Sequence, residues 1–256
     1  MSRWSTDRLR VALAPGEIAL ARGDGAPART FAAREAGLRG LLPALAEALS
    51  DSEWQTGRVE IVVSQHFVRH VVTPAPGKTL SRDEEHALVR GTFESIYGDA
   101  AVDWRLEVIS QPPQYGLLGA AMDAGFLAQL EQLLAAHAFT HITIQPLASR
   151  AVHRLPRNFT GWWVLTEPGW MTLFAGTGRV WKHVAAQPVG ADWAALLPEL
   201  IARETELASS EPGAPTVWLQ PVGTGPVALP QADAEEAWQV LPHHPEARGA
   251  HALLDI

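Results

Sequence analysis

Histidines are the first residues of this chain that could do chemistry, because it has ten of them and neutral imidazole is a common metal ligand. Three lie close together near the end of the chain: His243, His244 and His251. Pro242 and Pro245 interrupt the spacing that would place two imidazoles on one helix face. No Asp, Glu or Cys follows at ligand spacing either, so we predict no metal site.

Signatures of nucleophilic and acid–base catalysis are also missing. The chain has no cysteine, which excludes disulfides and thiolate chemistry. It has no G-x-S-x-G motif, and Ser64-Gln65-His66 lacks the context of a catalytic serine. Glu84 and Glu85 fall in the first turn of a predicted helix, where capping explains them. A triad assembled from distant residues stays open, so a small-molecule hydrolase remains an alternative without a positive feature.

A glycine-rich run follows a predicted strand near the end of the chain, Pro221-Val222-Gly223-Thr224-Gly225-Pro226. Such runs can hold phosphate when a helix or a Lys-Ser/Thr pair follows them. Neither follows here, so the run is interpreted as a surface turn.

Composition narrows the class of protein. The 256 residues carry a net charge of −8, which argues against a nucleic-acid binder with a basic face. The apolar runs are far shorter than the roughly 18 residues of a membrane helix. The first ten residues, MSRWSTDRLR, lack the apolar segment of a signal peptide. We therefore expect a soluble cytoplasmic protein without direct membrane insertion, in which any membrane association comes through a partner.

The elements that would position any site begin with a repeated stretch. Val11–Ala33 aligns without a gap on Val164–Ala186, 153 positions later. Each copy contains a strand, a Pro-Gly turn, a strand, a Gly-rich turn and a third strand. The chain is thus predicted to consist of two related halves, each opening with a three-stranded meander. The alternative is a chance likeness between two meanders that share turn glycines.

Hydrophobic periodicity and capping signals predict the remaining elements. Ser81 with Glu84 is a capping-box pattern, and Asp123 is a helix cap. Helices are expected at 35–50, 81–97, 124–137, 147–154, 191–207 and 233–240. Strands are expected at 58–64, 67–73, 103–110, 116–122, 141–145 and 216–221, with a loop and a closing strand after 240.

The order of elements indicates an α/β fold with a mixed sheet in each half. We predict a first half at 1–155, with a small α/β subdomain inserted at about 66–122. The second half is predicted at 156–256.

Ten tryptophans are unusual for a chain of this length. Trp181 and Trp193 are predicted to fill the core of the second half. Trp162 and Trp163 are adjacent on a strand and must face opposite ways, so one of them could cover a sheet face that needs a partner.

Two stretches carry a resemblance to a known family. Residues 59–74, VEIVVSQHFVRHVVTP, have a strand, a turn and a strand that ends in a proline before a helix. Residues 116–147, GLLGAAMDAGFLAQLEQLLAAHAFTHITIQPL, have a strand, a long helix and a strand ending near a proline. The chain resembles the actin-like ATPase superfamily, and within it the PilM proteins of type IV pili and the GspL cytoplasmic domain of type II secretion. The resemblance implies two actin-like, RNase H-like halves.

The resemblance also implies where nucleotide would bind and why it is not expected here. In the superfamily, both meander turns hold phosphates with an aspartate, glycines and a Ser or Thr. Here the turns carry Pro15-Gly16 and Pro168-Gly169, and each proline removes a donor N–H. Glu167 is the one acid leading into a turn, and the bulky Trp170 follows. We predict no cofactor and no ATPase activity; a nucleotide-binding ATPase with divergent phosphate loops is the alternative.

The function that the resemblance implies is a cytoplasmic scaffold in the inner-membrane assembly platform of a pilus or secretion system. Its partner would be a PilN/GspM-like single-pass membrane protein whose cytoplasmic segment docks in a groove beside the inserted subdomain. Self-association is left open. The predicted partner-binding residues are His66, Phe67, Val68, Arg69, His70, Val71, Leu88 and Phe93.

Overall fold

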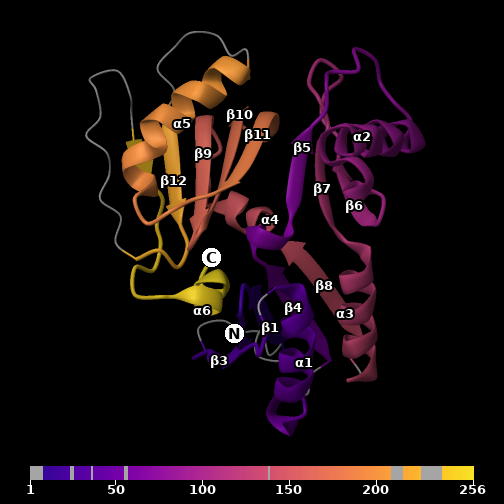
Figure 1. Cartoon of the computed structure of the whole chain (residues 1–256), viewed down its shortest axis with the longest axis vertical. Helices are drawn as coiled ribbons and strands as arrows, with labels where there is room; N and C mark the ends of the chain where they lie inside the picture. Colours follow the sequence, from indigo (N-terminus) through magenta and orange to yellow (C-terminus); the bar gives the residue numbers. More distant parts are fainter. Residues whose placement is uncertain are drawn as a thin grey trace.

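The computed structural model describes residues 8–23, 26–35, 37–54, 57–137, 139–208, 216–225 and 238–256. Within these residues the strands form two five-stranded sheets and one three-stranded sheet. Figure 1 shows the first sheet low in the molecule, the second above it, and the third beside the second. The sheets follow from the predicted elements, and they confirm the mixed α/β fold class.

The first sheet has the strand order β3-β2-β1-β4-β8. The meander is antiparallel, whereas β4 pairs in parallel with both β1 and β8. Apolar side chains of one face pack against α1 and α3. The strands are β1 (Arg8–Ala14), β2 (Glu17–Arg22), β3 (Arg29–Ala32), β4 (Arg58–Val63) and β8 (His141–Pro146), and the helices are α1 (Leu38–Leu49) and α3 (Ala124–Ala136).

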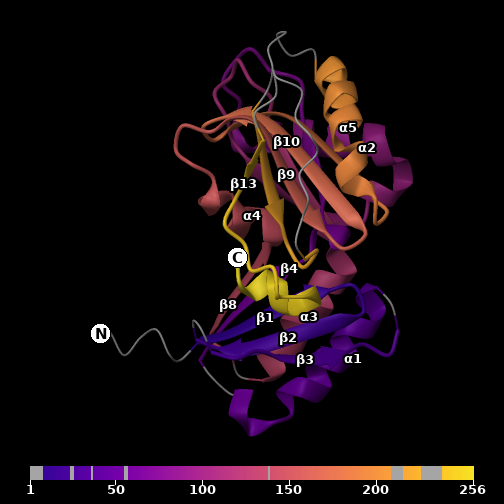
Figure 2. The same cartoon turned by 90° about the vertical axis from the view of Figure 1, so that its left-hand side faces the viewer.

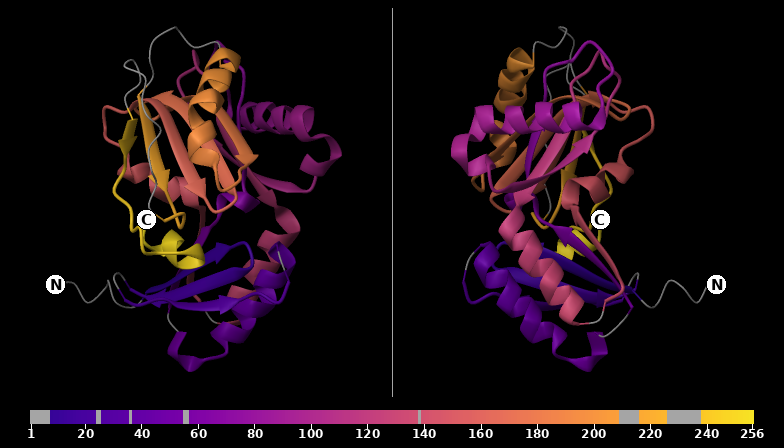
Figure 3. Two further views of the ribbon diagram at one scale, coloured as in Figure 1. Left: turned by 60° about the vertical axis from the view of Figure 1, so that its left-hand side comes forward. Right: turned by 90° about the vertical axis from the view of Figure 1, so that its right-hand side faces the viewer.

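The second sheet repeats this plan in the order β11-β10-β9-β12-β13. Its meander is antiparallel, and β12 pairs in parallel with β9 and β13. Helix α5 (Trp193–Leu207) packs across one face, as Figure 3 shows. The strands are β9 (Thr160–Glu167), β10 (Trp170–Thr177), β11 (Val180–Pro188), β12 (Val217–Pro221) and β13 (Trp238–Val240). The shared strand order supports the internal repeat.

The third sheet lies between β4 and α3 in the sequence and has the order β5-β7-β6. Helix α2 covers it with Val89 and Phe93 buried beneath. The capping box predicted for this helix is present, with Ser81 and Glu84 bonding each other's backbone. The elements are β5 (Arg69–Val72), α2 (Arg82–Tyr97), β6 (Trp104–Ile109) and β7 (Leu118–Asp123). An inserted sheet is therefore present, while the numerical domain boundaries stay a prediction.

Short helices complete the described part of the chain. They are α4 (Leu147–Ala151), α6 (Gly249–Leu254) and the 3₁₀ helices η1 (Ser52–Trp54), η2 (Gln65–Phe67), η3 (Gly98–Ala101) and η4 (Val152–Arg154). No described helix is long and apolar enough to cross a bilayer.

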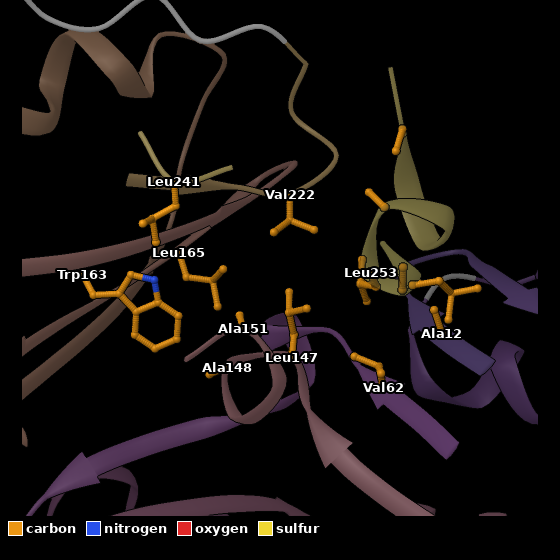
Figure 4. Packing of buried hydrophobic residues seen from close by; sticks show 14 of the residues in the cluster. Ala12, Val62, Leu147, Ala148, Ala151, Trp163, Leu165, Val222, Leu241 and Leu253 are labelled. Carbon is orange, nitrogen blue, oxygen red and sulfur yellow. The ribbon is translucent and has the colours of Figure 1, made fainter. Parts of the chain in front are cut away.

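A common core joins the two large sheets. Ala12 and Val62 of the first sheet, Trp163 of the second and Leu147 of α4 belong to one buried cluster. Figure 4 shows Leu253 of α6 beside Ala12, with Val222 on its other side. Helix α6 packs against β1 and β2, and Figure 2 shows it between the two sheets. The end of the chain therefore closes the space between the halves.

Two predictions near the end of the chain were wrong. Residues 238–240 form β13 rather than the end of a helix, because Trp238 and Val240 pair with Val217 and Leu219 of β12; positions 233–237 of that predicted helix lie outside the described residues. The predicted closing strand is instead α6. The apolar residues of α6 recur at helical spacing and are buried against the first sheet, and this burial stabilises the helix.

The predictions for the four tryptophans were confirmed only in part. Trp193 is buried in the cluster beneath α5, as expected, whereas Trp181 is buried in the core between the halves. Trp162 and Trp163 do face opposite ways, but both are buried: Trp162 packs in the cluster beneath α5, and Trp163 lies in the core between the halves. The prediction that one of them covers an open sheet face was wrong.

Candidate functional site

The two meander turns lie at the joint between the halves. Gly16 and Gly169 have φ of 79° and 78°, which favours glycine at this position of a tight turn. At the first turn, the carboxylate of Glu17 accepts a hydrogen bond from the backbone N–H of Ala250 at the start of α6. The first turn is therefore tied to the end of the chain.

The second turn is tied to the segment that leads into the inserted sheet. Glu167 is 3% exposed, and its carboxylate accepts the backbone N–H of Gln65 at 2.8 Å. Burial raises the pKa of Glu167 to about 7, although hydrogen bonds from Ser64 and Gln65 oppose the shift. His66 Nε2 lies 2.9 Å from the carbonyl oxygen of Pro168. We call this set, Ser64–His66 with Glu167–Pro168, the joint.

Trp170 follows the second turn and faces the same segment. Its ring centroid lies 5.4 Å from that of His66, and the guanidinium of Arg69 lies 5.1 Å from the indole centroid. These contacts place cation–π and ring packing at the turn where the family resemblance would place phosphate. The sequence shows a bulky indole at this turn but carries no signal for the residues that contact it.

Most of the predicted partner-binding residues lie in the stretch from η2 to β5, at the joint or next to it, and the other two lie on α2. Val68, Val71 and Phe93 are buried, and β5 runs beside β11 of the second sheet. Burial lowers the pKa of His70 to about 4, with Arg69 adding to the shift, and the His70 ring meets Phe174 edge-on at 5.3 Å. Phe67 and Leu88 are half-buried. Phe67 packs against the apolar cluster of the first sheet, and Leu88 packs against the cluster beneath α2. A role of these residues in partner binding stays a prediction.

A groove of about 360 Å³ lies on the other side of the inserted sheet. It is bounded by β6 and β7 of that sheet and by α3, β8 and the start of α4, elements that Figure 1 shows beside one another. The lining combines apolar and polar side chains. It comprises Arg105, Leu106, Glu107, Ala120, Ala121, Met122, Leu127, Glu131, Ile144, Gln145, Pro146 and Ser149.

Two sheet edges meet at this groove. β6 is an end strand of the inserted sheet, and β8 is an end strand of the first sheet. Ile109 and Ile142 are 46% and 36% exposed on these strands. An end strand presents N–H and C=O groups that an added extended segment can pair with. No motif in the sequence marks this groove, because it arises from residues that are far apart in the chain.

The mouth of the groove is polar. Arg105 Nη1 lies 2.6 Å from Glu131 Oε1, so a strand residue and a helix residue bridge one end. Glu107 is exposed beside them. The groove thus combines apolar side chains with two carboxylates and one guanidinium, which suits binding of a peptide rather than acid–base chemistry.

Other sites considered from the sequence have little support in the described residues. Among these residues, no three His, Cys, Asp or Glu side chains gather in a way that could hold a metal ion. Gly223 and Gly225 have positive φ, and Gly225 packs against the guanidinium of Arg248. The glycine-rich run is therefore a turn against the end of the chain; Pro226 lies outside the described residues.

Comparison with known structures identifies the fold. The chain is similar to the cytoplasmic domain of EpsL, an inner-membrane component of the type II secretion system of Vibrio cholerae, with a TM-score of 0.58 and 16% identity over 96% of this chain and 92% of that one.

It is also similar to a chain of the PilM-PilN type IV pilus biogenesis complex, with a TM-score of 0.55 and 13% identity over 85% and 82% of the two chains. A Bacteroides thetaiotaomicron protein of actin-like ATPase fold matches with a TM-score of 0.53 and 7% identity over 87% and 85%. No protein-family model and no curated protein matches. The chain therefore has an actin-like fold, as the sequence predicted.

Proposed function

We propose that the protein is a non-catalytic scaffold in the inner-membrane assembly platform of a pilus or secretion system. In this role it works at the cytoplasmic face of the membrane and binds the cytoplasmic segment of a PilN/GspM-like membrane protein. The observation that carries the proposal is the groove between the inserted sheet and the first sheet, in a fold shared with an EpsL cytoplasmic domain and a PilM-PilN chain.

The shape of the groove supports an extended peptide as its occupant. Its apolar lining includes Leu106, Met122 and Ile144, which can bury alternate side chains of a strand. The open edges of β6 and β8 can add main-chain hydrogen bonds. The groove, rather than the surface around His66–Thr73, is therefore the better candidate for the predicted docking site.

The charge at the rim supports the same occupant. Cytoplasmic segments next to a membrane span are enriched in Lys and Arg. Glu107 is exposed and lines the groove, whereas the carboxylate of Glu131 already pairs with Arg105. A basic residue flanking the apolar part of the segment would find a carboxylate there, which favours the correct register.

Three features support the absence of nucleotide hydrolysis. Pro15 and Pro168 occupy the two turns, where each lacks an N–H donor. Trp170 packs onto His66 and Arg69 beside the second turn. Helix α6 and its apolar side chains fill the space between the sheets. A saturable rise in the unfolding midpoint with Mg-ATP would favour the alternative, an ATPase with divergent loops.

The test uses the protein and a labelled peptide. The peptide is the cytoplasmic segment of a single-pass membrane protein encoded by an adjacent gene, and binding is followed by fluorescence anisotropy. We expect a dissociation constant below about 100 µM, equivalent to about −5.5 kcal/mol. Ser149→Trp places an indole in the groove from an exposed position of α4 and should weaken binding at least about tenfold.

The matched control is Ser95→Trp, which makes the same change at an exposed position of α2 and should leave binding unchanged. Absence of binding at 100 µM, or equal loss in both variants, would refute the proposal.

A further inference from the structure

A basic surface lies away from the groove, on the segment that links the two halves. Residues 132–166 contain no Asp or Glu, although the chain as a whole carries a net charge of −8. The end of this segment carries three basic side chains, and the β10–β11 turn carries a fourth. We call these four residues the basic patch: His153, Arg154, Arg157 and Arg179.

Hydrogen bonds tie the β10–β11 turn, which carries Arg179, to the segment that carries the other members of the basic patch. Arg179 Nη1 donates to the carbonyl oxygen of Val152 at 2.6 Å, and the N–H of Gly178 donates to the carbonyl oxygen of Phe159 at 2.6 Å. The β10–β11 turn is thereby fixed against η4 and the loop after it. Arg179 therefore lies beside His153 and Arg154.

No described carboxylate forms an ion pair with an arginine of the basic patch. Glu60, which pairs with Arg8 and Arg150, lines a pocket together with His153 and Arg154 and is the nearest acidic side chain named beside them. Arg154 donates to the carbonyl oxygens of Pro242 and Asp255, and Arg179 to that of Val152. Carbonyl oxygens fix a guanidinium without neutralising it. The carboxylate of Asp255 is directed to His251, at 3.7 Å. Arg157 is exposed and has no hydrogen bond or ion pair with the described residues.

We propose that the basic patch is a second docking surface, which binds an acidic segment of a partner protein. The anchored guanidinium groups of Arg154 and Arg179 lose little side-chain freedom on binding. The exposed guanidinium of Arg157 has its N–H donors available for a bidentate pair with a carboxylate. The remainder of the chain is strongly acidic, so an extended polyanion such as an anionic membrane or a nucleic acid would be repelled beyond the patch. A short acidic segment extends less far beyond the patch and meets less of this repulsion, since charges farther than the Debye length of about 8–10 Å are largely screened.

The proposal does not depend on the groove, and its test is separate. The probe is a fluorescein-labelled ten-residue peptide of alternating Glu and Ser, compared with its Gln counterpart, in anisotropy titrations at 50 and 300 mM NaCl. We expect the Glu peptide to bind, the Gln peptide not to, and added salt to weaken the complex.

Charge-reversal variants locate the binding. Arg157→Glu should weaken Glu-peptide binding at least about fivefold, and Arg157→Lys, which keeps the charge, should retain most of it. Arg39→Glu makes the same charge change at an exposed position of α1 and should have less than about a twofold effect.

Equal loss in Arg157→Glu and Arg39→Glu would overturn the proposal, because it would show a general charge effect. Binding to phosphatidylglycerol vesicles that Arg157→Glu abolishes, with no binding of the Glu peptide, would overturn it in favour of a lipid surface. Salt-sensitive self-association that Arg157→Glu abolishes, again without peptide binding, would overturn it in favour of a second copy of this chain.

Discussion

Replacing Glu167 with glutamine should stabilise the protein at neutral and alkaline pH. Burial raises the pKa of this carboxyl from an ordinary 4.5 to about 7. Each pKa unit corresponds to about 1.4 kcal/mol, so ionised Glu167 lowers the free energy of unfolding by about 3 kcal/mol. Because the folded-state pKa is raised, this contribution is favourable below pH 4.5 and is lost as pH rises through 7.

Glutamine keeps the geometry of the joint while removing the charge. Its side-chain oxygen can accept the N–H of Gln65, and its NH₂ group can donate to the hydroxyl of Ser64. The difference in unfolding free energy between Glu167→Gln and the wild type should grow from pH 4.5 to 7 and then stay near 3 kcal/mol. Glu167→Ala should instead be destabilising, because it leaves the buried N–H of Gln65 without its acceptor.

Urea unfolding followed by tryptophan fluorescence at pH 5, 6, 7 and 8 measures this difference. The matched control is Glu199→Gln, on the exposed side of α5, which should show no comparable growth with pH. A pH-independent difference for Glu167→Gln, or lower stability than the wild type at every pH, would refute the reasoning about the buried carboxyl.

Three further outcomes are expected in the same unfolding assay. Burial lowers the pKa of His70 from 6.5 to about 4, so the free energy of unfolding should fall as pH falls from 6.5 to 4. His70→Phe should remove this pH dependence, and an unchanged dependence in the variant would contradict the prediction. Gly119→Ala should destabilise by about 1–3 kcal/mol, since an added Cβ would lie 2.5 Å from Val89 Cγ1 and 3.0 Å from Phe93; a neutral effect would show that α2 can move away. Leu253→Ala should cost about 2–5 kcal/mol, because this side chain is buried in the core between the halves; a loss under 1 kcal/mol would mean that α6 contributes little to closing them.

The effects of Glu167 and His70 oppose each other in the wild type. Between about pH 4.5 and 6.5 both groups titrate mainly in the unfolded chain, because the folded protein keeps Glu167 largely protonated and His70 largely neutral. As pH rises through this window, the Glu167 contribution lowers stability and the His70 contribution raises it. Each effect is about 3 kcal/mol, so the wild type should show little net slope from these two groups. The single variants are therefore more informative than a pH profile of the wild type.

Local signals predicted most of the fold correctly. The Pro-Gly turns specify the meanders through residues such as Gly16 and Gly169, whose positive φ the structure requires. Ser81 with Glu84, and Asp123, begin helices where they were expected to. These signals act through a few neighbouring residues, so they can be read without knowing what packs against them.

The errors arose where tertiary contacts decide the outcome. Residues 238–240 read as helix by their sequence but are held as a strand by pairing with β12. Residues 249–254 form a helix because the first sheet offers an apolar face to cover. The groove left no local signal, since its walls come from β6, β7, α3, β8 and α4. Likewise, the pKa of Glu167 depends on its burial beside Gln65, 102 positions away.

The inserted sheet contacts both the proposed docking groove and the buried joint. On one side, it forms a wall of the groove with β6 and β7. On the other, polar ties hold it to the second half: the joint, and the amide of Gln111, which bonds both the N–H and the C=O of Trp181. A peptide that widened the groove would have to distort these hydrogen bonds, whereas a peptide that fits the groove in its present shape would leave them unchanged. The proposed docking therefore favours a segment that fits the groove without moving the inserted sheet, because the hydrogen bonds of the buried joint limit how far this sheet can move.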